Sequence, residues 1–172
     1  EMVFWDVAVN KETGKVMDKF YCPYCGLLTE KRNVEKAKIT LYDNALGKTI
    51  EQAKQLPVMI NYSVGRQRFE KTPDEEDLKL IEKIEEMDIP YWYPTDRMPE
   101  GYNTEQPKKS HGITHVHHFY TKRNLWVLSA IYEKIKNHNL SLLKLLYTSQ
   151  LINVSKLNRY RMNVSFPYNP LS

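Results

Sequence analysis

The chain has 172 residues, of which 41% are hydrophobic and 27% charged, a composition typical of a globular protein with one domain or two small ones. Its net charge of +4 permits a nucleic-acid partner without requiring one. No run of about 18 apolar residues exists, which argues against a membrane-spanning helix, and no signal-peptide pattern opens the sequence. The expected compartment is the cytoplasm.

The first 26 residues predict a β-hairpin that leads into a metal-binding turn. MVFWDVAV at 2–9 predicts a strand, NKETGK at 10–15 a turn, and VMDKFYC at 16–22 the returning strand. FYCPYCG overlaps its end and holds the only two cysteines of the chain, Cys22 and Cys25. A Cys-x-x-Cys-Gly turn is typical of a zinc knuckle, in which both thiolates point inward and the glycine relieves backbone strain.

A structural zinc ion takes four ligands, and one knuckle supplies two of them. Zinc ribbons separate their cysteine pairs by roughly 15–20 residues, and the predicted hairpin fills most of that distance between Glu1 and Cys22. We therefore expect the second pair just before residue 1, in a longer parent protein, and expect this chain alone to hold no tight zinc. A reduced cysteine pair without metal is the alternative, whereas a redox pair would begin a helix and is disfavoured.

The middle of the chain predicts strands and one well-marked helix. KAKITLYDNALGK at 36–48 is ambiguous, whereas QLPVMINYSV and GRQRFEK predict two strands joined by a turn at Gly65. TPDEEDLKLIEKIEEM predicts a helix with Thr72 as its N-cap and Pro73 as its first residue. This helix is expected to end before Pro90.

The C-terminal half predicts a long proline-rich loop at 89–119 and two antiparallel helices within 121–153. Six apolar residues of these helices are expected to be buried: Leu125, Leu128, Ile131, Leu142, Leu145 and Leu146. The predicted fold class is α+β. A β region at 1–70, with a truncated zinc ribbon and a small antiparallel sheet, precedes a region at 71–172 with three helices packed on that sheet.

The run HGITHVHH brings four histidines together in eight residues, namely His111, His115, His117 and His118. Imidazoles at this density can bind a metal ion. No carboxylate or cysteine stands beside them in the sequence, so we interpret the run as hydrogen-bonded polar surface and leave metal binding open.

Seven basic residues near aromatic or asparagine neighbours are candidate DNA contacts, since Arg and Lys can bind phosphates and base edges. They are Arg66, Arg68, Lys122, Arg123, Lys156, Arg159 and Arg161. For each of them, solvated surface is the alternative. Lys122 and Arg123 fall in the first turn of a predicted helix, where the helix dipole disfavours a cation. This misfit suggests a carboxylate or anion partner, for example Asp74 or Asp96 for Arg123.

Motifs for catalysis or cofactor binding are absent from the sequence. Its six glycines are scattered and form no phosphate or cofactor loop, and no Ser/His/Asp signature appears. We therefore predict no catalytic and no cofactor-binding residue in this chain.

Several longer segments together resemble one protein family. FYCPYCG, PVMINY, IPYWYPTDRMPEGYNTEQP, FYTKRNLWVLSAIYEKI and NRYRMNVSFPYNPLS are similar to the central region of zinc-ribbon-bearing, site-specific DNA methyltransferases described as adenine-specific. The resemblance spans nearly the whole chain. FYTKRNL and PVMINY are its most specific motifs, and the knuckle alone would be a weak signal.

The resemblance implies a place for the chain between two catalytic halves, an S-adenosylmethionine loop upstream and an Asp-Pro-Pro-Tyr/Phe motif downstream. It also implies that Cys22 and Cys25 are the second knuckle of the ribbon, and that double-stranded DNA and the remaining methyltransferase domain are the partners. The expected function is DNA recognition, without activity in the isolated chain. A bracing or dimerisation insert, and a zinc-ribbon adaptor that binds protein, are the alternatives.

Overall fold

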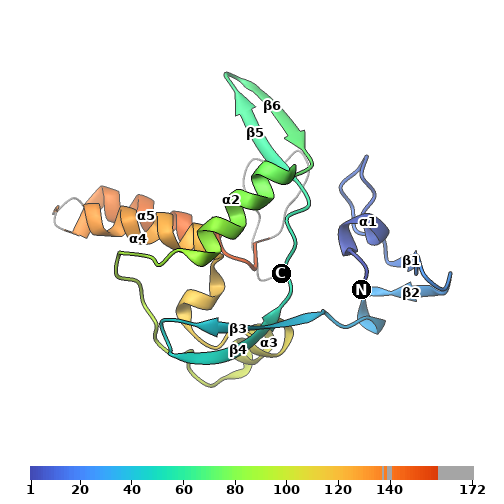
Figure 1. Ribbon diagram of the computed structural model, residues 1–172, viewed down its shortest axis with the longest axis horizontal. Coiled ribbons are helices and arrows are strands. Elements are labelled where there is room, and N and C mark those ends of the chain that lie inside the picture. Colours follow the sequence, from blue (N-terminus) through green and yellow to red (C-terminus); the bar gives the residue numbers. More distant parts are fainter. Residues whose placement is uncertain (137, 139–140, 159–172) are drawn as a thin grey trace.

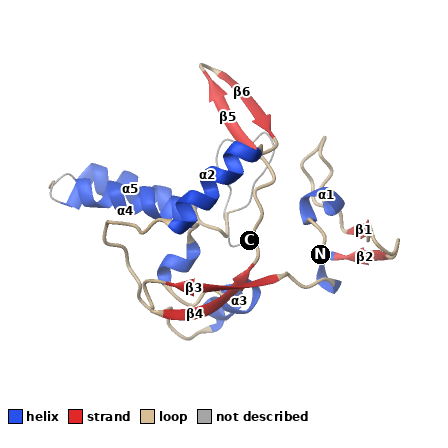
Figure 2. Cartoon of the chain, in the orientation of Figure 1, coloured by secondary structure: helices blue, strands red, loops and turns tan. Residues whose placement is uncertain are grey.

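The computed structural model describes residues 1–136, 138 and 141–158, and it confirms the predicted α+β class. Within these residues the chain forms three separate two-stranded antiparallel sheets and five α-helices (Figure 1). The expected single sheet beneath the helices does not form. Instead, the three hairpins lie apart from one another, and α4 and α5 extend away from all of them to one side (Figure 2).

The N-terminal part joins one helical turn to a short hairpin. Residues 2–9 were predicted as a strand, but Phe4–Ala8 forms helix α1. An apolar run of this length does not distinguish strand from helix, and tertiary packing decides. Phe4 packs edge-on against Phe20 at 5.7 Å between ring centroids, and Ala8 is fully buried. Phe20 belongs to strand β1 (Lys19–Tyr21), which pairs with β2 (Leu28–Glu30); a 3-10 turn, η1 (Lys31–Asn33), follows.

Two further hairpins follow. The ambiguous segment forms β3 (Lys38–Asp43) and β4 (Lys48–Ala53), which pair from Lys38 opposite Ala53 to Asp43 opposite Lys48. The predicted strands around Gly65 are confirmed as β5 (Ile60–Val64) and β6 (Gln67–Lys71). Gly65 has φ +61°, the left-handed conformation that tight two-residue hairpin loops require of their first residue.

Helix α2 (Glu75–Glu86) begins two residues later than the sequence predicts. Asp74, not Thr72, is the N-cap, and the prediction on this point was wrong. The Asp74 carboxylate accepts from the backbone N–H of Asp77, and the Asp77 carboxylate accepts from that of Asp74, both at 3.0 Å. The capping box is therefore formed by Asp74 and Asp77 and not by Thr72 and Glu75, and it satisfies two backbone N–H groups at the start of the helix.

The segment 89–119, predicted to be an irregular loop, contains helix α3 (Tyr102–His111) and a 3-10 turn, η2 (Val116–Phe119). Pro107 lies inside α3, and because proline disfavours a helix interior, no helix was predicted there. Gly112 ends α3 with φ +71° and lies directly against β4. A Cβ at this position would come within 2.2 Å of the Glu51 carbonyl oxygen.

Helices α4 (Lys122–Lys136) and α5 (Ser141–Asn153) confirm the predicted C-terminal helix pair and run side by side (Figure 1). Leu125 and Leu128 are buried, as expected. The burial expected of the other four residues was wrong: Ile131, Leu142, Leu145 and Leu146 are 42–67% exposed. Helix α4 contacts both α2 and α5, whereas the main contacts of α5 are with α4, so most of the apolar surface of α5 is exposed among the described residues.

The core of the described residues is small. Its fully apolar members are Ala8, Phe20, Ile113, Leu125 and Leu128, and six polar side chains are buried as well. No helix in the described part of the chain is both long and apolar enough to cross a bilayer.

Candidate functional site

The most buried polar group of the molecule is a cluster of one aspartate and two histidines, which we call the Asp–His cluster (Asp43, His117, His118). Asp43 ends β3, and the histidines lie in η2, so the fold brings them together across 74 and 75 positions. The Asp43 Oδ2 atom lies 2.9 Å from His117 Nε2 and 2.8 Å from His118 Nε2. Each of the three side chains is at most 8% exposed.

Both carboxylate oxygens of Asp43 are used. Oδ1 accepts from the backbone N–H groups of Ala45 and Leu46 at 3.0 and 3.1 Å, which fixes the β3–β4 turn. Burial raises the pKa of this carboxyl, but hydrogen bonds from His118, His117 and Leu46 lower it more, and the resulting pKa is about 2. The side chain is therefore an ionised hub that joins the turn to η2.

Thr114 determines which nitrogen of His118 carries the proton. Its backbone N–H donates to His118 Nδ1 at 3.3 Å, so Nδ1 is the acceptor and Nε2–H donates to Asp43. The Thr114 hydroxyl also contacts His115 Nδ1 at 2.9 Å, which links a third imidazole to the cluster. Burial is the main cause that lowers the pKa of both His118 and His115.

The Asp–His cluster offers a set of ligand atoms that a metal ion can use. Two imidazole nitrogens and one carboxylate oxygen lie within 4.8 Å of one another, and zinc and ferrous iron accept this set. A ligating histidine normally donates its other N–H to an acceptor. His118 Nδ1 faces the Thr114 N–H instead, and His117 Nδ1 is buried without a partner among the described residues. The contacts therefore favour a hydrogen-bonded hub over a metal centre.

The interpretation of the histidine run as polar surface was wrong for three of its four members. His115, His117 and His118 are at most 9% exposed, and their carboxylate partner comes from β3. His111 lies at the end of α3, where Lys36 donates to its Nε2 at 2.5 Å. Sequence analysis missed Asp43 because Asp-Asn-Ala-Leu-Gly reads as an ordinary turn, in which Asp caps the turn backbone.

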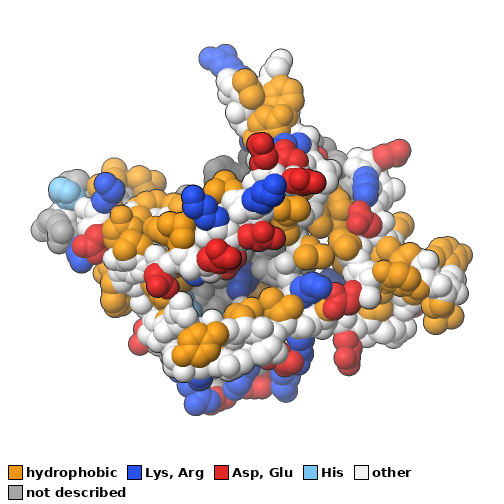
Figure 3. Space-filling view, viewed as in Figure 1, with side chains coloured by type: hydrophobic (Ala, Val, Ile, Leu, Met, Phe, Trp, Pro, Cys, Tyr) orange, Lys and Arg blue, Asp and Glu red, His pale blue; other side chains and the backbone are white. Residues whose placement is uncertain are grey.

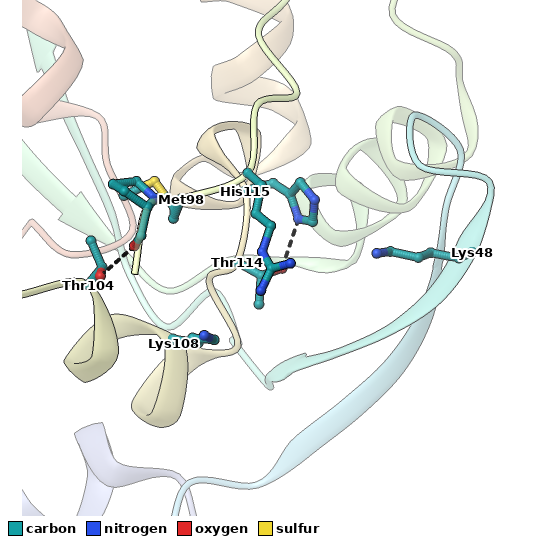
Figure 4. Close-up of a pocket in the computed structure, with 8 residues that line it drawn as sticks. Lys48, Met98, Thr104, Lys108, Thr114 and His115 are labelled. Atoms are coloured by element: carbon teal, nitrogen blue, oxygen red, sulfur yellow. Dashed lines mark hydrogen bonds between the residues drawn. The ribbon is translucent and has the colours of Figure 1, made fainter. Parts of the chain in front are cut away.

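A second polar site is a cavity of about 310 Å³ at the outer side of the cluster, here called the basic cavity. Its polar lining is drawn in Figure 4 and consists of Lys48, Arg97, Thr104, Lys108, Thr114 and His115. Met98 and Pro99 complete the lining. None of its basic residues was among the predicted DNA contacts.

A second, smaller cavity of about 220 Å³ lies between α4, α5 and the 92–94 segment. Its walls are mainly aromatic and aliphatic, and the Trp92 ring lies 5.5 Å from that of Tyr132, which in turn lies 5.8 Å from that of Tyr147. His117 and Ser129 are its main polar neighbours. This aromatic packing holds α4 and α5 on the centre of the molecule.

The predicted metal turn has the backbone of a knuckle. Cys22 N–H donates to the Leu27 carbonyl and Gly26 N–H to the Cys22 carbonyl, both at 2.9 Å, while Gly26 has φ +68°. Backbone N–H groups of Tyr24 and Cys25 lower the pKa of the Cys22 thiol. The turn thus favours thiolate. Among the described residues, no third metal-ligating side chain joins this cysteine pair.

The predicted DNA contacts fall into separate places. Arg66 and Arg68 are exposed on the β5–β6 hairpin. Lys122 Nζ donates to the backbone carbonyl of Glu85 at 2.5 Å, so its partner is the C-terminal end of α2 and not the carboxylate or anion that its position suggested. Arg123 forms no ion pair with Asp74, Asp96 or another described carboxylate.

Lys156 is the most enclosed of these basic residues. Its Nζ donates to the buried Gln52 side chain at 3.0 Å, and burial lowers the pKa of its ammonium group. Arg159 and Arg161 lie outside the described residues.

The β5–β6 hairpin stands out from the rest of the molecule (Figure 1). Every residue of β6 is exposed, and the hairpin packs chiefly on itself, with the rings of Tyr62 and Phe69 stacked at 5.5 Å. In Figure 3, basic side-chain atoms lie on one side of its tip, beside hydrophobic and uncharged ones. Arg66 and Arg68 have no carboxylate partner among the described residues, whereas Lys71 at the base pairs with Asp74 and Asp77.

Comparisons of the chain with protein-family models, with curated proteins and with solved structures found no match.

Proposed function

We propose that this chain is the DNA-recognition insert of a site-specific DNA methyltransferase, and that the β5–β6 hairpin is its reading element. The observation that carries the proposal is the exposed two-stranded ribbon with two unpaired arginines at its tip. The major groove of B-form DNA admits a two-stranded β-ribbon, and arginine is the side chain that most often binds guanine there. The family resemblance of the sequence points to the same partner.

The chemistry of methyl transfer would belong to other parts of the parent protein. In this proposal the parent binds S-adenosylmethionine and methylates a flipped adenine in the cytoplasm, while the insert holds the duplex. The Cys22–Cys25 turn would bind zinc as half of a ribbon whose other half the parent supplies. The isolated chain would then bind DNA without methylating it.

The test is DNA binding by the purified chain and its variant Arg66→Ala plus Arg68→Ala. Fluorescence anisotropy with a labelled duplex, measured over a range of salt, gives affinity and salt slope. If both arginines bind phosphates, the slope should fall by about two units, since each phosphate contact contributes about one. A base contact would instead lower affinity by about 1–3 kcal/mol on one sequence only.

The matched control is Lys11→Ala plus Lys15→Ala, which removes the same charge from an exposed turn in another part of the molecule. It should leave the affinity nearly unchanged. Equal losses of DNA affinity in the two double variants would show that the hairpin arginines contribute only through the net charge of the chain. Unchanged affinity in the hairpin variant would end the proposal for this element. Arg159→Ala plus Arg161→Ala in the intact parent enzyme applies the same test to the segment after residue 158.

A second candidate function, an insert that braces the methyltransferase body or its dimer, is favoured by the α4–α5 pair. Leu142, Leu145 and Ile152 of α5 are 55–67% exposed, and hydrophobic side chains cover this arm in Figure 3. Contiguous exposed apolar surface commonly marks a protein contact. Sedimentation of the chain alone separates the cases, because a concentration-dependent dimer that Leu142→Glu abolishes would support bracing.

A further inference from the structure

We propose that the basic cavity binds a phosphate group. The proposal rests on the cavity alone and does not depend on the role of the β5–β6 hairpin. Lys48 comes from β4, Lys108 from α3, and Arg97 from the segment between α2 and α3, so the fold gathers three cations that are far apart in the sequence. Figure 4 shows these side chains around one space.

The charge of the lining is positive because no carboxylate lines the cavity. Glu100 contacts Arg97 Nη2 at 2.8 Å and Lys108 Nζ at 3.0 Å, and Glu105 contacts Lys108 Nζ at 3.2 Å. Neither glutamate belongs to the lining. The two carboxylates therefore fix the arginine and the lysine in place and neutralise part of their charge.

Lys48 supplies the charge that remains uncompensated. Its Nζ forms no ion pair or hydrogen bond with any described residue, and in Figure 4 the side chain points from β4 toward His115. A lysine held next to a cavity without a carboxylate is available to a ligand anion. The nearby positive charge also acts on His115, because Lys48 is the largest cause after burial that lowers its pKa.

His115 provides a donor inside the cavity wall. It is 9% exposed, its Nδ1 is engaged by the Thr114 hydroxyl at 2.9 Å, and its Nε2 has no hydrogen-bond partner among the described residues. When the Thr114 hydroxyl donates to Nδ1, the proton of the neutral imidazole lies on Nε2, and this N–H can donate to a phosphate oxygen in the cavity.

The backbone holds these groups in place before any ligand arrives. Arg97 and His115 face each other in an antiparallel bridge. The Met98 N–H donates to the Thr114 carbonyl at 2.9 Å, and the Val116 N–H donates to the Asp96 carbonyl at 3.0 Å. Preformed sites of this kind lose little conformational entropy when a ligand binds. The cavity volume of about 310 Å³ is at the small end of known ligand sites, which suits a phosphate group.

The experiment is a titration of the full chain with inorganic phosphate, followed by the side-chain NMR signals of its five histidines at constant ionic strength. The His115 signal should move and saturate, and that of exposed His138 should stay in place. Lys48→Gln should weaken phosphate binding about tenfold, as expected for one charged hydrogen bond. Lys79→Gln on α2, which removes the same charge outside the cavity, should not. A His115 signal that chloride moves equally, or equal affinities in the two variants, would overturn the proposal.

Two sources of phosphate are distinguished by a second titration. If a short DNA duplex moves the His115 signal as phosphate does and competes with it, the ligand is a backbone phosphate of DNA. If the duplex leaves that signal in place while phosphate moves it, the cavity serves a free phosphate-bearing molecule. Loss of DNA binding through the hairpin variant leaves the phosphate titration unaffected, so the two proposals can fail separately.

Discussion

His118 Nε2 donates to Asp43 Oδ2 at 2.8 Å and so ties η2 to the end of β3 across 75 positions of sequence. Because the same oxygen also accepts from His117, one carboxylate holds the β3–β4 hairpin onto the centre of the molecule. When one partner of such a buried group is removed, the others remain buried without a hydrogen-bond partner, and this loss is the main effect on stability.

Asp43→Asn should destabilise the chain by roughly 3 kcal/mol, because an amide nitrogen or a single amide oxygen cannot satisfy four N–H donors. Urea unfolding followed by circular dichroism measures the change. Asp88→Asn is the matched control, since the Asp88 side chain is exposed and accepts only from Asn44, at 2.9 Å. It should cost less than about 0.5 kcal/mol. Equal losses of unfolding free energy in the two variants would show that the Asp–His cluster contributes no more to stability than an exposed carboxylate does.

Stability should fall as the pH drops from 7 toward 4. The pKa of His111 is lowered to about 4, mainly by burial, and burial also lowers that of His115 and His118. Between the folded value and the ordinary pKa of 6.5, the unfolded chain binds more protons, so acid favours unfolding. Asp43, whose folded pKa is about 2, adds a further loss between pH 4 and 2.

Urea midpoints at pH 7 and pH 5 check this dependence. His111→Gln should flatten it, because glutamine keeps an acceptor for Lys36 without a titrating group. His138→Gln changes an exposed histidine and should leave the pH dependence of the midpoint unchanged. A pH-independent midpoint in the unmodified chain would contradict the burial of these imidazoles.

Leu128→Ala should cost about 2–5 kcal/mol, because Leu128 is 6% exposed and its truncation leaves a cavity beneath α4. Leu142→Ala is the same substitution at a position 67% exposed on α5 and should cost less than about 0.5 kcal/mol. Chemical unfolding of both variants is the measurement. A large loss for Leu142→Ala would mean that α5 is covered in solution, as in a dimer.

Gly112→Ala should destabilise the junction between α3 and β4 by more than about 1 kcal/mol, since the new Cβ would meet the Glu51 carbonyl oxygen at 2.2 Å. Gly65→Ala separates the two causes. Gly65 shares the positive φ but has open space around it, so this variant carries the conformational cost without the collision. The difference in melting temperature between the variants reports the close approach of α3 to β4.

Purified chain should carry no tightly bound zinc, because Cys22 and Cys25 are two ligands where a closed structural site needs four. Elemental analysis of the protein after chelator treatment decides. Should one equivalent of zinc remain, Cys22→Ser and Asp43→Asn would locate it. Loss of the metal in the first variant would place it at the knuckle, and loss in the second would place it at the Asp–His cluster.

Local sequence by itself determined the features that depend on neighbouring residues. The knuckle turn with Gly26, the β5–β6 hairpin around Gly65, and helices α2, α4 and α5 all follow from patterns that act within a few residues. The exact start of α2 was the exception, because two capping boxes overlap there, Thr72 with Glu75 and Asp74 with Asp77, and the second is the one that forms.

Tertiary structure alone decided the sites. Local pattern gives no distance between Asp43 and His118, or between Lys48 and Arg97, because these pairs meet only when β3–β4 packs against the 96–118 segment. Tertiary structure also decided burial. The apolar periodicity of α5 predicts a buried face, but a helix face is buried only where another element covers it. Among the described residues, no element covers most of the apolar surface of α5. Contacts across long sequence separations depend on the packing of the whole chain, and no local propensity encodes them.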